Sequence, residues 1–92
     1  MPDPTPDLIA ELRAQVDAVD DRLLAALGER LALARALGDA KAARGLRGRD
    51  PARERAIVAR LAAQGAVPPD LVSHVWAALF TASRWVQTDH PG

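Results

Sequence analysis

The feature that most constrains this chain is an apolar stripe that continues through almost its entire first half. The stripe consists of Leu8, Leu12, Val16, Val19, Leu23, Leu27, Leu31, Ala34 and Leu37. Its mean step is about 3.6 residues, which is the period of a straight α-helix. The Thr-Pro-Asp at residues 5–7 supplies a cap, a proline suited to the first helical position and an acid for the positive end of the helix dipole. The pattern predicts one helix over residues 5–44.

A helix of this length is too long for one compact domain of 92 residues. At ~1.5 Å per residue it spans roughly 55–60 Å, whereas a domain of this size has a radius of gyration of about 12 Å. One copy of the chain therefore cannot cover the stripe. Because closed homodimers are the commonest oligomers, we expect a second copy to cover it.

Two shorter helices are predicted after a glycine-bounded loop. Asp50-Pro51 combines a cap with a proline at the first helical position and opens a helix over residues 50–64. Gly65 and the following Pro-Pro end it, and a third helix is expected over residues 69–88. We expect residues 1–4 to form a disordered tail. The predicted fold class is all-α, with residues 1–92 as a single domain of three helices, one of them very long.

Composition excludes several classes of function. Twelve basic and twelve acidic residues give no net charge, which argues against a nucleic-acid surface. Without cysteine there is neither a disulfide nor thiolate chemistry, and His74 and His90 alone do not make a metal site. No long apolar run or signal-peptide pattern is present, so we expect a cytoplasmic protein without a membrane span. We expect no metal and no cofactor.

Cations fall where the first helix should be apolar. Arg30 and Lys41 are eleven residues apart, so they differ by only about 20° around the helix, and both lie within the stripe. Arg13 is about 100° from Arg30, at the edge of the stripe. A buried cation without a matching acid costs several kcal/mol. The pattern therefore indicates that an anionic group comes to these side chains.

The later helices also place polar groups on their apolar faces. Glu54 lies within the apolar face of the second helix, with Asp50 one turn earlier and Arg53 at the edge. Ser83 lies within the apolar face of the third helix, and Gln87 follows one turn later. Counted with Arg13, Arg30 and Lys41, these residues leave a surplus of two positive charges, which a small dianion would balance.

These residues together resemble the all-helical chorismate mutase family. The resemblance runs from Leu12-Arg13 to Gln87. It includes GERLALARALGDAK with Arg30 and Lys41, RDPARER with Asp50, Arg53 and Glu54, and the Ser83-x-x-x-Gln87 pair. Two positions depart from the family pattern: Gly48 replaces an apolar residue, and Phe80 replaces an aliphatic one.

The resemblance implies an intertwined homodimer with two shared active sites. Arg13 of the partner chain, Arg30 and Arg53 would then hold the two carboxylates of chorismate, assisted by Ser83. Lys41 and Gln87 would donate hydrogen bonds to the ether oxygen. Asp50 and Glu54 would accept hydrogen bonds from the ring hydroxyl.

The implied activity is that of an isomerase, the rearrangement of chorismate to prephenate. Two other hypotheses remain. The same fold can act on a related substrate, as an aminodeoxychorismate mutase or an isochorismate pyruvate lyase, or the chain can be a non-catalytic helical dimer.

The site residues also have purely structural interpretations. Arg30 and Lys41 could extend to solvent or pair with acids across a dimer interface. Asp50 suits a helix cap, and Glu54 could bridge Arg53, Arg55 or another basic residue. Ser83 could bond a backbone carbonyl, and Gln87, close to the C-terminus, could be solvated.

Overall fold

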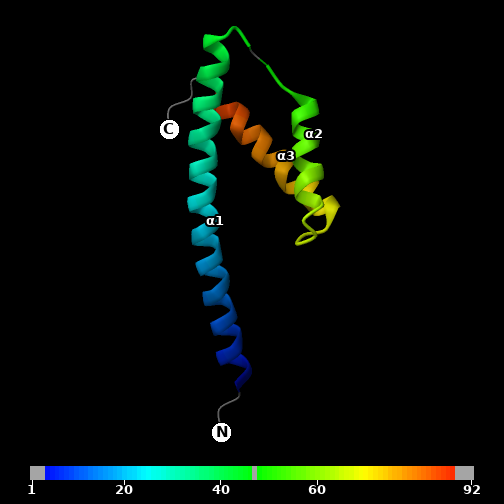
Figure 1. The fold of residues 1–92 in the computed structure, drawn as a ribbon. Coiled ribbons are helices and arrows are strands. Elements are labelled where there is room, and N and C mark those ends of the chain that lie inside the picture. The colour runs from blue at the N-terminus through cyan, green and yellow to red at the C-terminus, as the bar shows by residue number, and fades with distance from the viewer. Residues whose placement is uncertain (1–3, 47, 89–92) are drawn as a thin grey trace. The chain divides into compact units, whose positions relative to one another are not determined.

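The computed structural model describes residues 4–46 and 48–88, and these residues form three α-helices. They are α1 (Pro4–Ala43), α2 (Pro51–Ala62) and α3 (Pro69–Val86), as Figure 1 shows. The described residues contain no strand, which confirms the predicted all-α class with three helices. The expected N-terminal tail falls mostly on residues 1–3, outside the described residues, whereas Pro4 is already helical.

The helices end where local hydrogen bonding changes. At the end of α1, the Leu46 amide donates to the carbonyl of Lys41 at 2.8 Å, and the Gly45 amide donates to Ala42 at 3.0 Å. Gly45 has φ +72°, the left-handed conformation that closes such a pair of bonds and that glycine adopts without a steric cost. α1 therefore stops at Ala43, one residue before the expected end.

α2 begins as its sequence predicts. The Asp50 side chain accepts a hydrogen bond from the Arg53 amide at 3.0 Å, and Pro51 occupies the first turn. The helix ends at Ala62, two residues before the expected Gln64, because the Gln64 and Gly65 amides turn back to Leu61 and Ala62. α3 likewise ends at Val86, two residues before the expected Thr88.

The chain divides into two compact units, residues 1–30 and residues 31–92. In the first unit the apolar stripe is open to solvent: its members Leu8, Leu12, Val16, Val19 and Leu23 are 42–61% exposed. The length of the helix led us to expect that one copy of the chain could not cover this stripe, and these residues are indeed exposed in the single chain. A single chain has too few elements to cover a face of this length.

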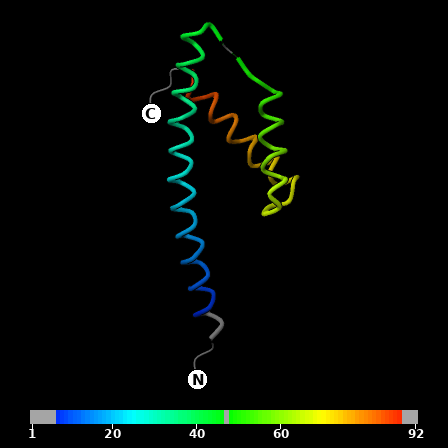
Figure 2. The backbone as a smooth tube through the Cα atoms, viewed as in Figure 1, coloured from blue at the N-terminus to red at the C-terminus, as the bar shows by residue number. Residues whose placement is uncertain are grey.

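The second unit contains the only buried apolar side chains among the described residues. They are Ala34 from α1 and Val72, Phe80 and Val86 from α3. α2 and α3 pack against each other, and the chain reverses direction between them, as the backbone trace in Figure 2 shows. This small core positions the polar side chains described next.

Candidate functional site

A cavity of about 340 Å³ in the second unit brings together residues from the end of α1, the following loop and the end of α3. Its polar lining includes Asp39, Lys41, Arg49, Arg84 and Gln87. We call it the Lys41–Gln87 cavity, because these two residues approach it from helices that are far apart in the sequence. It therefore brings together the two residues that the family resemblance assigns to the same substrate atom.

Lys41 lies in the last turn of α1 and is half-buried. Its ammonium Nζ donates to the carbonyl of Gly48 at 3.5 Å, which is the long limit of a hydrogen bond. An ammonium carries three donors, so this long contact leaves Lys41 able to donate to another acceptor. Gly48, which departs from the family pattern, has φ +93° and thus a conformation that suits glycine.

Gln87 follows the last residue of α3 and is also half-buried. Its side-chain Nε2 donates to the backbone carbonyl of Ala34 at 2.8 Å, which ties the end of α3 to α1. The approach is close because Gly38 has no side chain: a Cβ at that position would lie 2.7 Å from the Gln87 Cγ. The interpretation of Gln87 as solvated is therefore wrong. The amide has a second N–H that can donate to a ligand.

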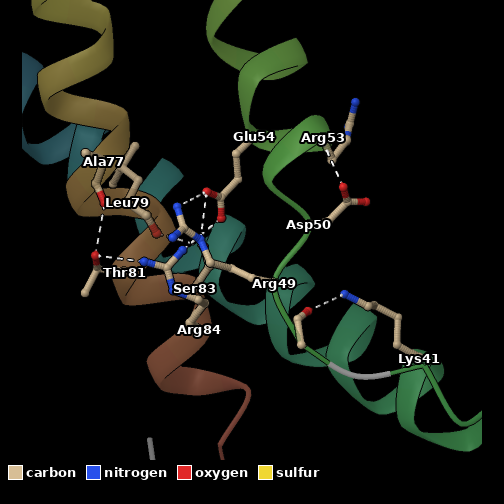
Figure 3. Close-up of polar contacts among 11 residues, drawn as sticks. Lys41, Arg49, Asp50, Arg53, Glu54, Ala77, Leu79, Thr81, Ser83 and Arg84 are labelled. Atoms are coloured by element: carbon tan, nitrogen blue, oxygen red, sulfur yellow. Dashed lines mark hydrogen bonds and ion pairs between the residues drawn. The ribbon is translucent and has the colours of Figure 1, made fainter.

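Glu54 is held between two arginines (Figure 3). Arg49 donates to its Oε1 through Nη2 at 2.8 Å and through Nε at 3.3 Å, and Arg84 donates to its Oε2 through Nη1 at 2.8 Å. The hydrogen bond from Arg49 is the main cause that holds the pKa of Glu54 below its ordinary value, with a further contribution from the charge of Arg84. Glu54 is therefore an ionised acceptor at neutral pH. We call this group the Arg49–Glu54–Arg84 cluster.

Neither arginine of this cluster was among the residues predicted from the sequence. Arg84 is thirty residues from Glu54 and on a different helix, so no local spacing connects them. Arg49 precedes the helix that carries Glu54, and a loop residue has no helical phase from which its direction can be read. The expected bridge from Glu54 to a basic residue exists, but its partners are not the two neighbours suggested by the sequence.

The remaining predicted residues of the second unit have local roles in this structure. The Asp50 carboxylate caps α2, and the Ser83 hydroxyl donates to the Leu79 carbonyl at 2.9 Å. Arg53 is exposed, and Figure 3 shows its side chain directed away from Glu54. These placements agree with the structural interpretations of Asp50 and Ser83.

Arg13 and Arg30 belong to the first unit, and the other six candidate site residues belong to the second. Arg13 is exposed and Arg30 is half-buried. In the described part of the chain, no group of three or more histidine, cysteine, aspartate or glutamate residues could hold a metal ion. None of the described helices combines the length and apolar character needed to span a membrane.

A second cavity, of about 530 Å³, lies along α2 and α3. Its apolar part includes Val58 and Phe80, and its polar part includes Glu54, Arg49 and Arg84. The two arginines therefore line both cavities, whereas Glu54 lines only this one. Phe80, the other departure from the family pattern, is buried here and contributes to the small core.

In a comparison with protein families, the family model of chorismate mutase type II matches residues 12–88. The matched range contains all eight of the candidate site residues, from Arg13 to Gln87. A comparison with curated proteins gave no match.

Proposed function

The chain belongs to the chorismate mutase type II family, and from that premise we propose that it is an isomerase that rearranges chorismate to prephenate. The observation that carries the proposal is the family match, which includes every candidate site residue. The common cavity of Lys41 and Gln87 supports it further, because it brings two hydrogen-bond donors from distant parts of the chain to one place.

The reaction makes modest chemical demands on a protein. It is a pericyclic rearrangement in which an ether C–O bond breaks while a C–C bond forms within one molecule. It therefore needs no nucleophile and no net proton transfer. A protein accelerates it by holding the substrate in its compact reactive conformer and by stabilising the negative charge that develops on the ether oxygen.

We assign to Lys41 and Gln87 the stabilisation of the negative charge that develops on the ether oxygen. Among the described residues, the Lys41 ammonium has one long hydrogen bond, to the Gly48 carbonyl, and the Gln87 amide has one N–H bonded to the Ala34 carbonyl and a second one to offer. Donors that are fixed before the reaction lower the barrier without further reorganisation. The hydrogen bond from Gln87 to Ala34 supports this assignment, because it holds the amide in place.

The substrate carboxylates are assigned to arginines. Arg13 of the partner subunit, Arg30 and Arg53 bind them, with Ser83 assisting, since arginine forms strong paired hydrogen bonds to carboxylates. Asp50 and Glu54 accept hydrogen bonds from the ring hydroxyl. Arg53 and Ser83 are directed elsewhere in the free chain, so we expect them to reorient when the substrate binds.

The proposed assembly is an intertwined homodimer with two shared sites. It is supported by the exposed stripe of α1, since a long face of exposed leucine and valine side chains marks an interaction surface. A second copy of α1 presents a face of the same length and character.

The test is incubation of the purified protein with chorismate, 4-amino-4-deoxychorismate and isochorismate in separate reactions, with identification of the products. Formation of prephenate from chorismate supports the proposal. Aminodeoxyprephenate from the amine alone, or pyruvate from isochorismate alone, would transfer the assignment to the related activities. A folded protein that converts none of the three would favour the hypothesis of a non-catalytic helical dimer.

A further inference from the structure

Arg84 stands between the two cavities of the second unit. It lines the Lys41–Gln87 cavity on one side and, together with Glu54, the cavity along α2 and α3 on the other. It belongs to α3 and immediately follows Ser83. None of the proposed site roles uses it, although it is a cation that lines the same cavity as the proposed catalytic lysine.

The Arg84 guanidinium is held in place from two directions. Its Nη1 donates to the Glu54 carboxylate at 2.8 Å, and its Nη2 donates to the Thr81 hydroxyl at 3.3 Å. Thr81 in turn donates to the Ala77 carbonyl at 3.1 Å, so the support is anchored to the backbone of α3 (Figure 3). A guanidinium has five N–H donors, so these two contacts leave others for an anion.

The charges around the Lys41–Gln87 cavity favour an anionic ligand. Among the described residues, three cations line it, Lys41, Arg49 and Arg84, and Asp39 is the only acid. Glu54 offsets one further positive charge from outside the cavity, and a positive surplus still remains. A dicarboxylate is therefore attracted to this cavity before any residue of a second chain is counted.

Arg84 is better prepared to bind such an anion than Arg49 or Arg53. The Arg49 side chain is 58% exposed, against 38% for Arg84, and Arg49 lies in a loop. Arg53 is exposed and directed away from Glu54. An arginine that is already held by fixed acceptors loses less conformational freedom when it binds.

We propose that Arg84 is a further substrate-binding residue, which binds one carboxylate of the dianionic substrate in the Lys41–Gln87 cavity while Glu54 and Thr81 hold its guanidinium. This inference rests on the proposed function for the identity of the substrate. It gives Glu54 a second task, the positioning of Arg84.

The experiment compares the wild-type protein with Arg84→Gln, Arg84→Lys and the control Arg60→Gln. Arg60 is an exposed residue in the last turn of α2, so its replacement removes one positive charge away from both cavities. KM, kcat and melting temperature are measured with chorismate. Dissociation constants are measured by calorimetry for chorismate and for each of its two monomethyl esters.

We expect Arg84→Gln to raise KM for chorismate roughly 10- to 100-fold, the effect of one charge-assisted hydrogen bond, with kcat changed by only a few-fold. The KM of Arg84→Lys should lie between those of the wild type and Arg84→Gln, because an ammonium keeps the positive charge but lacks the paired N–H donors of a guanidinium. The ester whose methyl group blocks the carboxylate that Arg84 binds should bind equally well to the wild type and to Arg84→Gln. The other ester should still bind more weakly to Arg84→Gln. Arg60→Gln should behave as the wild type.

An unchanged KM for Arg84→Gln, or an equal loss of affinity for chorismate and both esters, would overturn the inference. If Arg84→Gln does not fold, the ester comparison is made with Arg84→Lys, and an affinity equal to the wild type for all three compounds would overturn it. The failure of the proposed function has a different signature. In that case chorismate binds with the dependence on Arg84 described here, and no prephenate forms.

Discussion

Lys41 is the only lysine of the chain, and its hydrogen bond to the Gly48 carbonyl is long, at 3.5 Å. If Lys41 stabilises the breaking ether bond, Lys41→Ala should lower kcat by about 10²–10³-fold, the effect of removing one preorganised donor. Lys41→Arg should also have a low kcat, because a planar guanidinium does not replace a compact ammonium. The melting temperature should not fall, since no strong contact is lost. Turnover and thermal melting are measured on both variants, and a normal kcat for Lys41→Ala would reject the catalytic role.

The contribution of Glu54 to the stability of the folded chain depends on pH. Its pKa is lower in the folded chain than in the unfolded chain, first because of the hydrogen bond from Arg49. The resulting stabilisation is complete above the unfolded pKa of about 4.3 and is lost as the pH falls through the lower folded pKa. The difference in melting temperature between the wild type and Glu54→Gln should therefore be largest at pH 6–7 and shrink below about pH 4.

The matched control is Glu11→Gln, which removes a carboxylate at an exposed position of α1. Thermal melting from about pH 7 to pH 3 is followed for the three proteins in parallel. A Glu54→Gln difference that stays constant over this range would show that the Arg49–Glu54–Arg84 cluster does not stabilise the fold through its charge.

At the scale of elements, two glycines of α1 give a matched comparison. A Cβ at Gly38 would lie 2.7 Å from the Gln87 Cγ, whereas a Cβ at Gly28 meets nothing within 4 Å in the chain. Gly38→Ala should displace Gln87 from the Ala34 carbonyl, lower the melting temperature and reduce kcat. Gly28→Ala should stabilise α1 by up to about 1 kcal/mol, because alanine has the higher helix propensity. Equal melting temperatures and equal kcat values for the two variants would contradict the proposed contact between Gln87 and α1.

At the scale of the whole molecule, the exposed stripe predicts an obligate dimer. Leu8, Leu12 and Leu23 are 49–61% exposed, and a helix with such a face gains most of its stability by packing it. Folding and association should therefore occur together. Sedimentation and helicity are followed over a wide range of dilution, and we expect helicity to fall as the dimer dissociates. A folded, fully helical monomer at low concentration would contradict the intertwined assembly.

Shared active sites predict that two inactive variants restore activity when mixed. Arg13→Ala and Lys41→Ala chains are combined under conditions that exchange subunits. If Arg13 acts in the site of the partner chain, one site of the heterodimer receives both substitutions and the other receives neither, so activity reappears. Continued inactivity, with exchange proven by mass-labelled chains, would reject the sharing.

The sequence by itself determined the helices, because their signals are local. The 3.6-residue period of the stripe, the Asp50-Pro51 start of α2 and the absence of strand patterns all depend on residues within a few positions of each other. The order and spacing of its motifs likewise indicated the family to which the chain belongs. The helix ends differed by one or two residues, because turns such as that at Gly45 decide them through backbone conformation.

Only the tertiary structure decided which side chains meet. The contact between Arg84 and Glu54 spans thirty residues, and that between Gln87 and Ala34 spans fifty-three. Such contacts depend on how each helix is rotated and placed against the next, which a local period does not specify. The sequence therefore identified Glu54, Lys41 and Gln87 as residues out of place on apolar faces. The fold alone decided that Arg49 and Arg84 hold the first, and that the other two line one cavity.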